Sequence, residues 1–135
     1  MKRGILSSAI VWGILLLAFP LAVLAGEPDP GRELYLKYCA SCHGKDGRSD
    51  GPVSPYLQVK PTDLTRLKKE NRGIYPLGKV MSSIDGTHDV RGHGDAKMPV
   101  WGEVFEKEVE GKKYPTLTSL LKVKVIAEYI STLQR

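Results

Sequence analysis

The chain has few of the residue types on which many folds and functions depend. Its 135 residues include only two cysteines and three histidines, and aromatic residues make up 7% of the total. Two cysteines are too few for a disulfide-rich framework or for the Cys₄ and Cys₃His zinc sets. No basic run is interleaved with aromatic residues, so nucleic-acid binding has little support. No segment alternates apolar and polar residues over a convincing strand length, which argues against a β fold.

Acidic residues are also missing from the start of the chain, where the sequence predicts an export signal. Two basic residues open it, residues 5–24 are almost wholly apolar, and Glu27 is the first acidic residue. We therefore predict that residues 1–25 are a signal peptide cleaved ahead of Gly26. An uncleaved membrane anchor is the alternative, because the apolar run approaches the roughly 20 residues that cross a bilayer. Both interpretations put residues 26–135 in the periplasm or otherwise outside the cytoplasm.

Residues 26–135 are expected to form one small domain of mildly basic charge. They hold 18 basic and 15 acidic side chains, since Lys2 and Arg3 are the only charged residues before position 26. A low positive excess fits steering toward an acidic protein partner. A domain of this size buries only a modest core of its own, so a large apolar cofactor would supply part of that core.

Several helical patterns occur in this domain, separated by long loops rich in glycine and proline. The helices we expect are residues 30–39 with Asp29 as N-cap, a short one from Asp63 through Lys69, residues 77–86, and residues 123–133 preceded by a cap at Thr116 or Thr118. Residues 106–113 are predicted to be a solvated loop or a short exposed turn. The predicted fold class is all-α with long loops.

The strongest motif is Cys39-Ala40-Ser41-Cys42-His43. Two cysteines three positions apart can both reach one porphyrin as thioethers, and the histidine that follows them can ligate the iron. We predict that Cys39 and Cys42 bind one haem c covalently and that His43 is an iron ligand.

Three other interpretations of the motif have less support. A thioredoxin-like redox pair would need a strand followed by a helix around the cysteines, whereas a helix precedes them here and a glycine-rich loop follows. Zinc would need four ligands in a closed structural site. A plain disulfide between Cys39 and Cys42 would leave His43 unexplained.

The second axial ligand decides between a closed electron-transfer haem and an open, ligand-binding one. Met98 is our candidate, because it lies in predicted irregular chain directly before Pro99 and far enough from His43 to reach the opposite haem face. Met81 falls on the apolar face of a predicted helix, where methionine usually fills the core. His88 and His93 remain alternatives.

Taken together, these residues resemble a class I c-type cytochrome of the bacterial monohaem kind. The resemblance covers most of residues 26–135: Gly31 and Tyr35 match the first helix, Cys39 to His43 the haem motif, Met98-Pro99 the distal segment, and Val125 to Leu133 the last helix. It implies a small cytochrome c fold, with three to five helices and long loops around one haem.

The resemblance also implies particular contacts. The first and last helices should cross, setting Gly31 and Tyr35 against Ile126, Tyr129 and Ile130. The Pro52 carbonyl should accept the ring N–H of His43, fixing its orientation. Trp101 and Tyr56 are expected either to pack on the porphyrin or reach a propionate, or to be plain core. The charged segment Glu106 to Tyr114 departs from the family pattern.

With His43 and Met98 as ligands, the expected function is one-electron transfer by a periplasmic carrier that is not itself an enzyme. Its partners would be redox proteins, a donor and an acceptor that the sequence does not identify, with no nucleic acid and with membrane contact only if the N-terminal segment is retained. The alternative is a haem c subunit of a larger membrane or periplasmic oxidoreductase complex, with residues 106–114 as a docking candidate. A haem enzyme or gas sensor with an open sixth position is the weakest hypothesis, because it leaves Met98 without a role.

Overall fold

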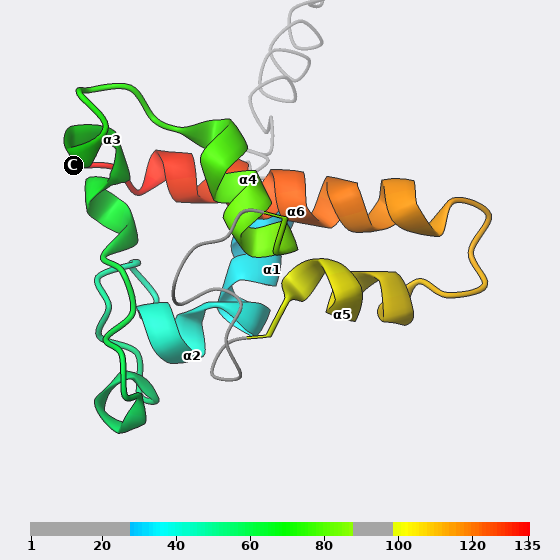
Figure 1. Cartoon of the computed structure of the whole chain (residues 1–135), viewed down its shortest axis with the longest axis horizontal. Coiled ribbons are helices and arrows are strands. Elements are labelled where there is room, and N and C mark those ends of the chain that lie inside the picture. Colours follow the sequence, from blue (N-terminus) through cyan, green and yellow to red (C-terminus); the bar gives the residue numbers. More distant parts are fainter. Residues whose placement is uncertain (1–27, 88–98) are drawn as a thin grey trace, which may run out of the picture.

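The computed structural model describes residues 28–87 and 99–135, which form six α-helices and two short 3-10 helices without any strand (Figure 1). The elements are α1 (Pro30–Tyr38), α2 (Ala40–His43), η1 (Ser54–Tyr56), η2 (Leu64–Arg66), α3 (Leu67–Glu70), α4 (Leu77–Asp85), α5 (Trp101–Glu108) and α6 (Pro115–Thr132). The predicted all-α class is confirmed. The predicted signal peptide and the ligand candidates His88, His93 and Met98 lie outside the described residues. Within the described part, no helix is both long and apolar enough to cross a membrane.

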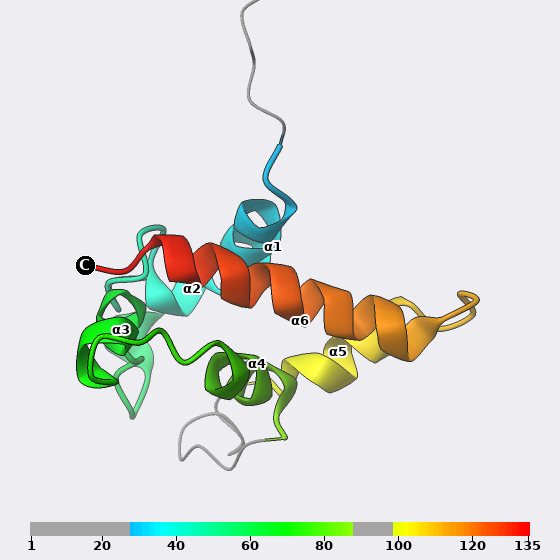
Figure 2. The same ribbon diagram turned by 90° about the horizontal axis from the view of Figure 1, so that it is seen from above.

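The longest helix, α6, organises the others. Figure 2 shows α6 running between α1 on one side and α4 on the other, and α5 also packs along it. At the α1 crossing, a Cβ added to Gly31 would lie 2.3 Å from the Val125 carbonyl oxygen, so only glycine allows this approach. Next to it, the Tyr35 and Tyr129 rings lie 5.2 Å apart between centroids. The predicted contact between the first and last helices is confirmed.

Three of the predicted helix boundaries follow from local chemistry. The Asp29 side chain accepts hydrogen bonds from the Gly31 and Arg32 backbone N–H groups at the start of α1. The Asp63 side chain caps η2 in the same way, through the Thr65 N–H. Gly86 ends α4 in the left-handed conformation, with φ of 87°.

Two local predictions about the C-terminal half are wrong. Residues 106–113 are not a simple loop, because α5 continues to Glu108 and Val109 is 1% exposed. Neither Thr116 nor Thr118 caps α6, which begins at Pro115. Proline at the first helical position already fixes the helix start, and the Thr118 hydroxyl instead donates to the Tyr114 carbonyl within the first turn.

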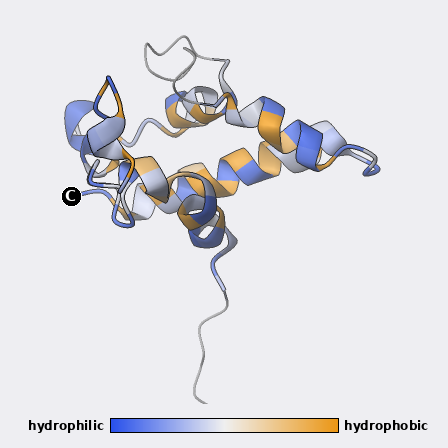
Figure 3. Cartoon of the chain, turned by 90° about the horizontal axis from the view of Figure 1, so that it is seen from below, coloured by the Kyte–Doolittle hydropathy of each residue, from blue (hydrophilic) through white to orange (hydrophobic). Residues whose placement is uncertain are grey.

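The core lies where α6 meets the other helices. Figure 3 shows that hydrophobic residues recur along α6, and those that are buried against its neighbours include Val123, Ile126 and Ile130. The largest fully buried side chains, all less than 2% exposed, are Tyr35, Phe105, Val109, Val123 and Ile126. Beyond α6, the chain folds back onto η2. There the Gln134 side-chain amide donates a hydrogen bond to the Leu64 carbonyl, and the Arg135 backbone N–H donates one to the Thr65 carbonyl. The C-terminus thereby holds η2 against the core.

The tight crossing predicts that adding one methyl group at Gly31 lowers the stability of the fold. Gly31→Ala should lower the free energy of unfolding by about 1–3 kcal/mol, because the two helix backbones must separate. Gly78→Ala in α4 is the matched control: nothing lies within 4 Å of its added Cβ, so it should be neutral or stabilising by up to about 1 kcal/mol. Denaturant unfolding measures both. Equal stability of the two variants would contradict the crossing.

Candidate functional site

An apolar cavity of about 290 Å³ lies under the first turn of α5, bounded by α2, η2, α4 and α6. Its wall includes Cys39, His43, Leu64, Val80, Trp101 and Ile130. These residues come from segments that are far apart in the sequence, and the helix packing around α6 brings them together. The cavity thus contains two of the four residues predicted to hold a haem.

The cysteine-histidine motif forms a tight corner between α1 and α2. Cys39 is the C-cap residue of α1 and the N-cap residue of α2. Its carbonyl accepts a hydrogen bond from the His43 backbone N–H at 2.9 Å. Gly44 then ends α2 with φ of 82°, a conformation that favours glycine. The Tyr35 hydroxyl donates to the Gly44 carbonyl at 2.7 Å, and burial raises the pKa of Tyr35, so the phenol remains a proton donor.

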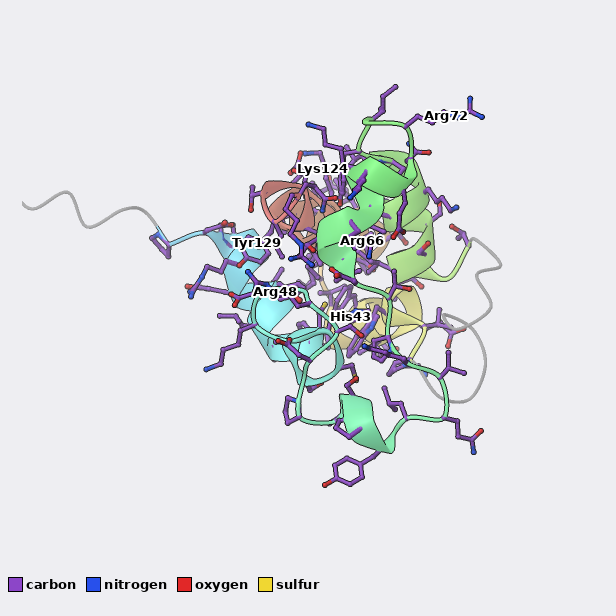
Figure 4. All side chains as sticks on the ribbon, turned by 90° about the vertical axis from the view of Figure 1, so that its left-hand side faces the viewer. His43, Arg48, Arg66, Arg72, Lys124 and Tyr129 are labelled. Atoms are coloured by element: carbon purple, nitrogen blue, oxygen red, sulfur yellow. The ribbon has the colours of Figure 1, made fainter. Side chains whose placement is uncertain are left out.

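His43, the last residue of α2, is 4% exposed, and its side chain lies in the interior of the molecule (Figure 4). Its Nδ1 lies 3.0 Å from the Thr62 carbonyl oxygen. Because a carbonyl can only accept a hydrogen bond, Nδ1 carries a proton, and in the neutral imidazole Nε2 then carries the lone pair. This is the tautomer that a metal-ligating histidine needs at Nε2.

The acceptor for His43 is therefore not the Pro52 carbonyl, and that expectation is wrong. Gly51 packs directly on the α2 backbone, where an added Cβ would lie 2.3 Å from the Ser41 carbonyl oxygen, and the Val53 N–H donates to the same oxygen. These contacts tie the turn around Pro52 to the α2 backbone and leave Pro52 exposed.

Thr62 reaches the ring because two other hydrogen bonds hold its segment. The Ser49 hydroxyl donates to the Pro61 carbonyl, and the Leu64 N–H donates to the Gly47 carbonyl at 2.8 Å. Sequence reasoning missed Thr62, since its contribution is a backbone carbonyl that any residue would supply. The one signal was its position directly before the Asp63 cap.

The two thiols differ in their surroundings, although both are free of a disulfide. Cys39 is 7% exposed and lines the cavity, while Cys42 is partly exposed. Burial, and secondarily the neighbouring Cys42, raises the pKa of the Cys39 thiol to about 12. A thioredoxin-like pair depends on a lowered thiol pKa, so this corner does not fit that chemistry. Among the residues that the structure describes, no three His, Cys, Asp or Glu side chains gather to hold a metal ion.

Trp101 and Tyr56, for which the sequence analysis gave the same expectation, differ in their burial and in their position relative to the cavity. Tyr56 is 85% exposed and lies away from the cavity wall. Trp101 lines the cavity, and its indole Nε1 is buried without a hydrogen-bond partner within the described ranges. A buried N–H without a partner is costly. A haem propionate is an acceptor of the kind that this donor lacks, so the indole adds to the fit of the donor set to a haem.

Of the candidates for the second axial ligand, Met81 alone lies in the described part of the chain. It is half-buried on α4, where it packs against the core cluster and is not part of the cavity wall. This agrees with the prediction that Met81 fills the core.

Comparison with protein families gives one match, to the family described as "Cytochrome C oxidase, cbb3-type, subunit III", over residues 26–111. Searches of curated proteins and of solved structures find no match. The matched range includes the cysteine-histidine motif, Trp101 and the predicted Met98 segment. Proteins of this kind carry covalent haem c, transfer electrons and are typically extracytoplasmic. The chain belongs to this family of c-type cytochromes.

Proposed function

We propose that the protein transfers single electrons through one haem c bound to Cys39 and Cys42, with His43 and Met98 as axial ligands. The observation that carries this proposal is that Cys39 and His43 share the wall of one apolar cavity. When bound there, the haem supplies an iron that alternates between the ferric and ferrous states. A low-spin iron with two strong protein ligands changes its geometry little between these states, which favours fast transfer.

Each neighbouring residue has a definite part in this scheme. The Thr62 carbonyl holds the His43 ring so that Nε2 presents its lone pair. The buried Trp101 N–H would donate to a haem propionate. Apolar side chains such as Val80 and Ile130 exclude water from the cavity, and such exclusion tunes the reduction potential.

Covalent geometry supports Met98 as the distal ligand. It precedes Trp101 by three residues, so their Cα atoms are separated by at most about 11 Å, and Trp101 lines the cavity. Thioether sulfur also favours ferrous iron relative to a second imidazole, which suits a carrier better than ligation by His88 or His93.

We further propose that residues 1–25 are an export signal and that the domain of residues 26–135 works in the periplasm as a carrier between redox proteins. Its small excess of positive charge supports brief complexes with acidic partners, in which fast dissociation matters more than affinity. On this proposal the protein carries electrons and is not itself an enzyme.

The ligand assignment has a direct spectroscopic test. The ferric holoprotein should show the near-infrared band of methionine-ligated haem, and Met98→Ala should abolish it. Met81→Leu is the matched control, since Met81 packs in the core, and it should keep the band. An unchanged band in Met98→Ala, or no band in the parent protein, would contradict ligation by Met98.

A second candidate function is that of a haem c subunit in a larger oxidoreductase complex. The description of the matched family as an oxidase subunit favours it. Purification under mild conditions separates the two functions. If the protein is a free carrier, it should elute without other chains. A second chain that elutes with it in stoichiometric amount would show that it is a subunit of a complex and would contradict the carrier function.

A further inference from the structure

The first half of α6 has a second apolar face that no described element covers. Its inner face packs on α5, where the Ser119 hydroxyl donates to the Gly102 carbonyl and Phe105 is fully buried. Its outer face presents Leu117, Leu120 and Leu121, which are 54%, 48% and 51% exposed. We call these three side chains the leucine face. A helix that is apolar on both sides normally has both sides covered.

The rim of the leucine face is basic and aromatic. Tyr114, at the start of α6, is 59% exposed, and the Lys113 ammonium lies 5.2 Å from the centroid of its ring. Lys112 is exposed beside it, and Glu110 is the single acidic residue of this turn. Leucines flanked by lysine and tyrosine suit the interface of an anionic bilayer, where apolar side chains enter the acyl boundary and cations meet phosphate.

The length of the connecting chain limits how far the predicted apolar segment of residues 5–24 can lie from the leucine face. Gly31 meets Val125 at the helix crossing, and Val125 lies one turn, about 6 Å along the axis, from Leu121. The link from residue 25 to the start of α1 at Pro30 spans at most about 17 Å. If residues 5–24 stay in a membrane, the leucine face is held close to it.

The leucine face points away from the cavity. Leu117 and Ile130, which lines the cavity, lie 13 positions apart on α6, so their directions differ by roughly 140°. Contact through the leucines would leave the cavity side open to a redox partner. The N-terminal end of α6, which carries this face, extends away from α2 and α3 together with the C-terminal end of α5 (Figures 1 and 2).

We propose that the leucine face rests on a lipid bilayer containing anionic headgroups, with Tyr114, Lys112 and Lys113 at the headgroup level. The contact does not require residues 1–25, which would add a tether where they are retained. A second copy of the chain suits the face less well, because a stable protein interface uses about 20–30 residues a side, whereas three leucines and a tyrosine are exposed here.

Photocrosslinking of the full-chain holoprotein tests this proposal. Leu121 is replaced by p-benzoylphenylalanine, and the protein is irradiated with vesicles of phosphatidylcholine and phosphatidylglycerol. Ile74, which is apolar and 70% exposed in the turn before α4, receives the same probe as the control. Leu117 carries it in a third protein, so that the result does not depend on one position.

We expect lipid adducts at residues 117 and 121 in several-fold higher yield than at residue 74, measured by mass spectrometry of the digested chain. Vesicles of phosphatidylcholine alone should lower the yield, since the lysines then lose their anionic partners. Equal yields at all three positions would overturn the proposal. A crosslinked dimer in place of the lipid adduct would also overturn it, and would assign the face to self-association.

Discussion

The close crossing of α1 and α6 at Gly31 is the constraint on which the rest of the structure depends. Because glycine lets the α1 backbone approach the Val125 carbonyl, the backbones of the two helices come into direct contact at this point, beside the packed Tyr35 and Tyr129 rings. The far end of α1, at Cys39, is thereby brought to the same cavity as Ile130 near the end of α6. The contact is thus more than core packing, because it sets the distance between the haem motif and the opposite wall.

Around this crossing, backbone groups position the cavity residues. The Cys39 carbonyl orients the backbone of His43, the Thr62 carbonyl orients its ring, and the Gly44 carbonyl accepts the buried phenol of Tyr35. Groups held in this way lose little freedom when a ligand binds, so the corner is preorganised. In the proposed carrier, a setting of this kind would keep His43 in place in both redox states.

Residue patterns with a local physical cause could be predicted from the sequence. Asp29 and Asp63 act as caps, and Gly86 ends a helix. The crossing at Gly31 was expected only from the resemblance to class I c-type cytochromes. The features that were missed depend on tertiary contacts. Helix α5 has only eight residues and no side-chain cap, so its pattern could not be told from a polar loop.

The candidate site shows the same division. Cys39 and His43 were identified by spacing alone, because haem attachment needs those atoms in that order. The partner of His43 was assigned to Pro52 by analogy, whereas the loop between α2 and η2 presents the Thr62 carbonyl instead. A backbone acceptor leaves no mark in the sequence, and neither does the buried indole N–H of Trp101, which has no partner among the described residues.

On the proposed function, the corner formed by Cys39, Cys42 and His43 holds the haem. Mass spectrometry of a tryptic digest of the holoprotein tests it most directly, since cleavage after Lys37 and Lys45 isolates residues 38–45. This peptide should carry the mass of one haem, joined through both sulfurs. The peptide without added mass, or with its two cysteines joined in a disulfide, would contradict the claim.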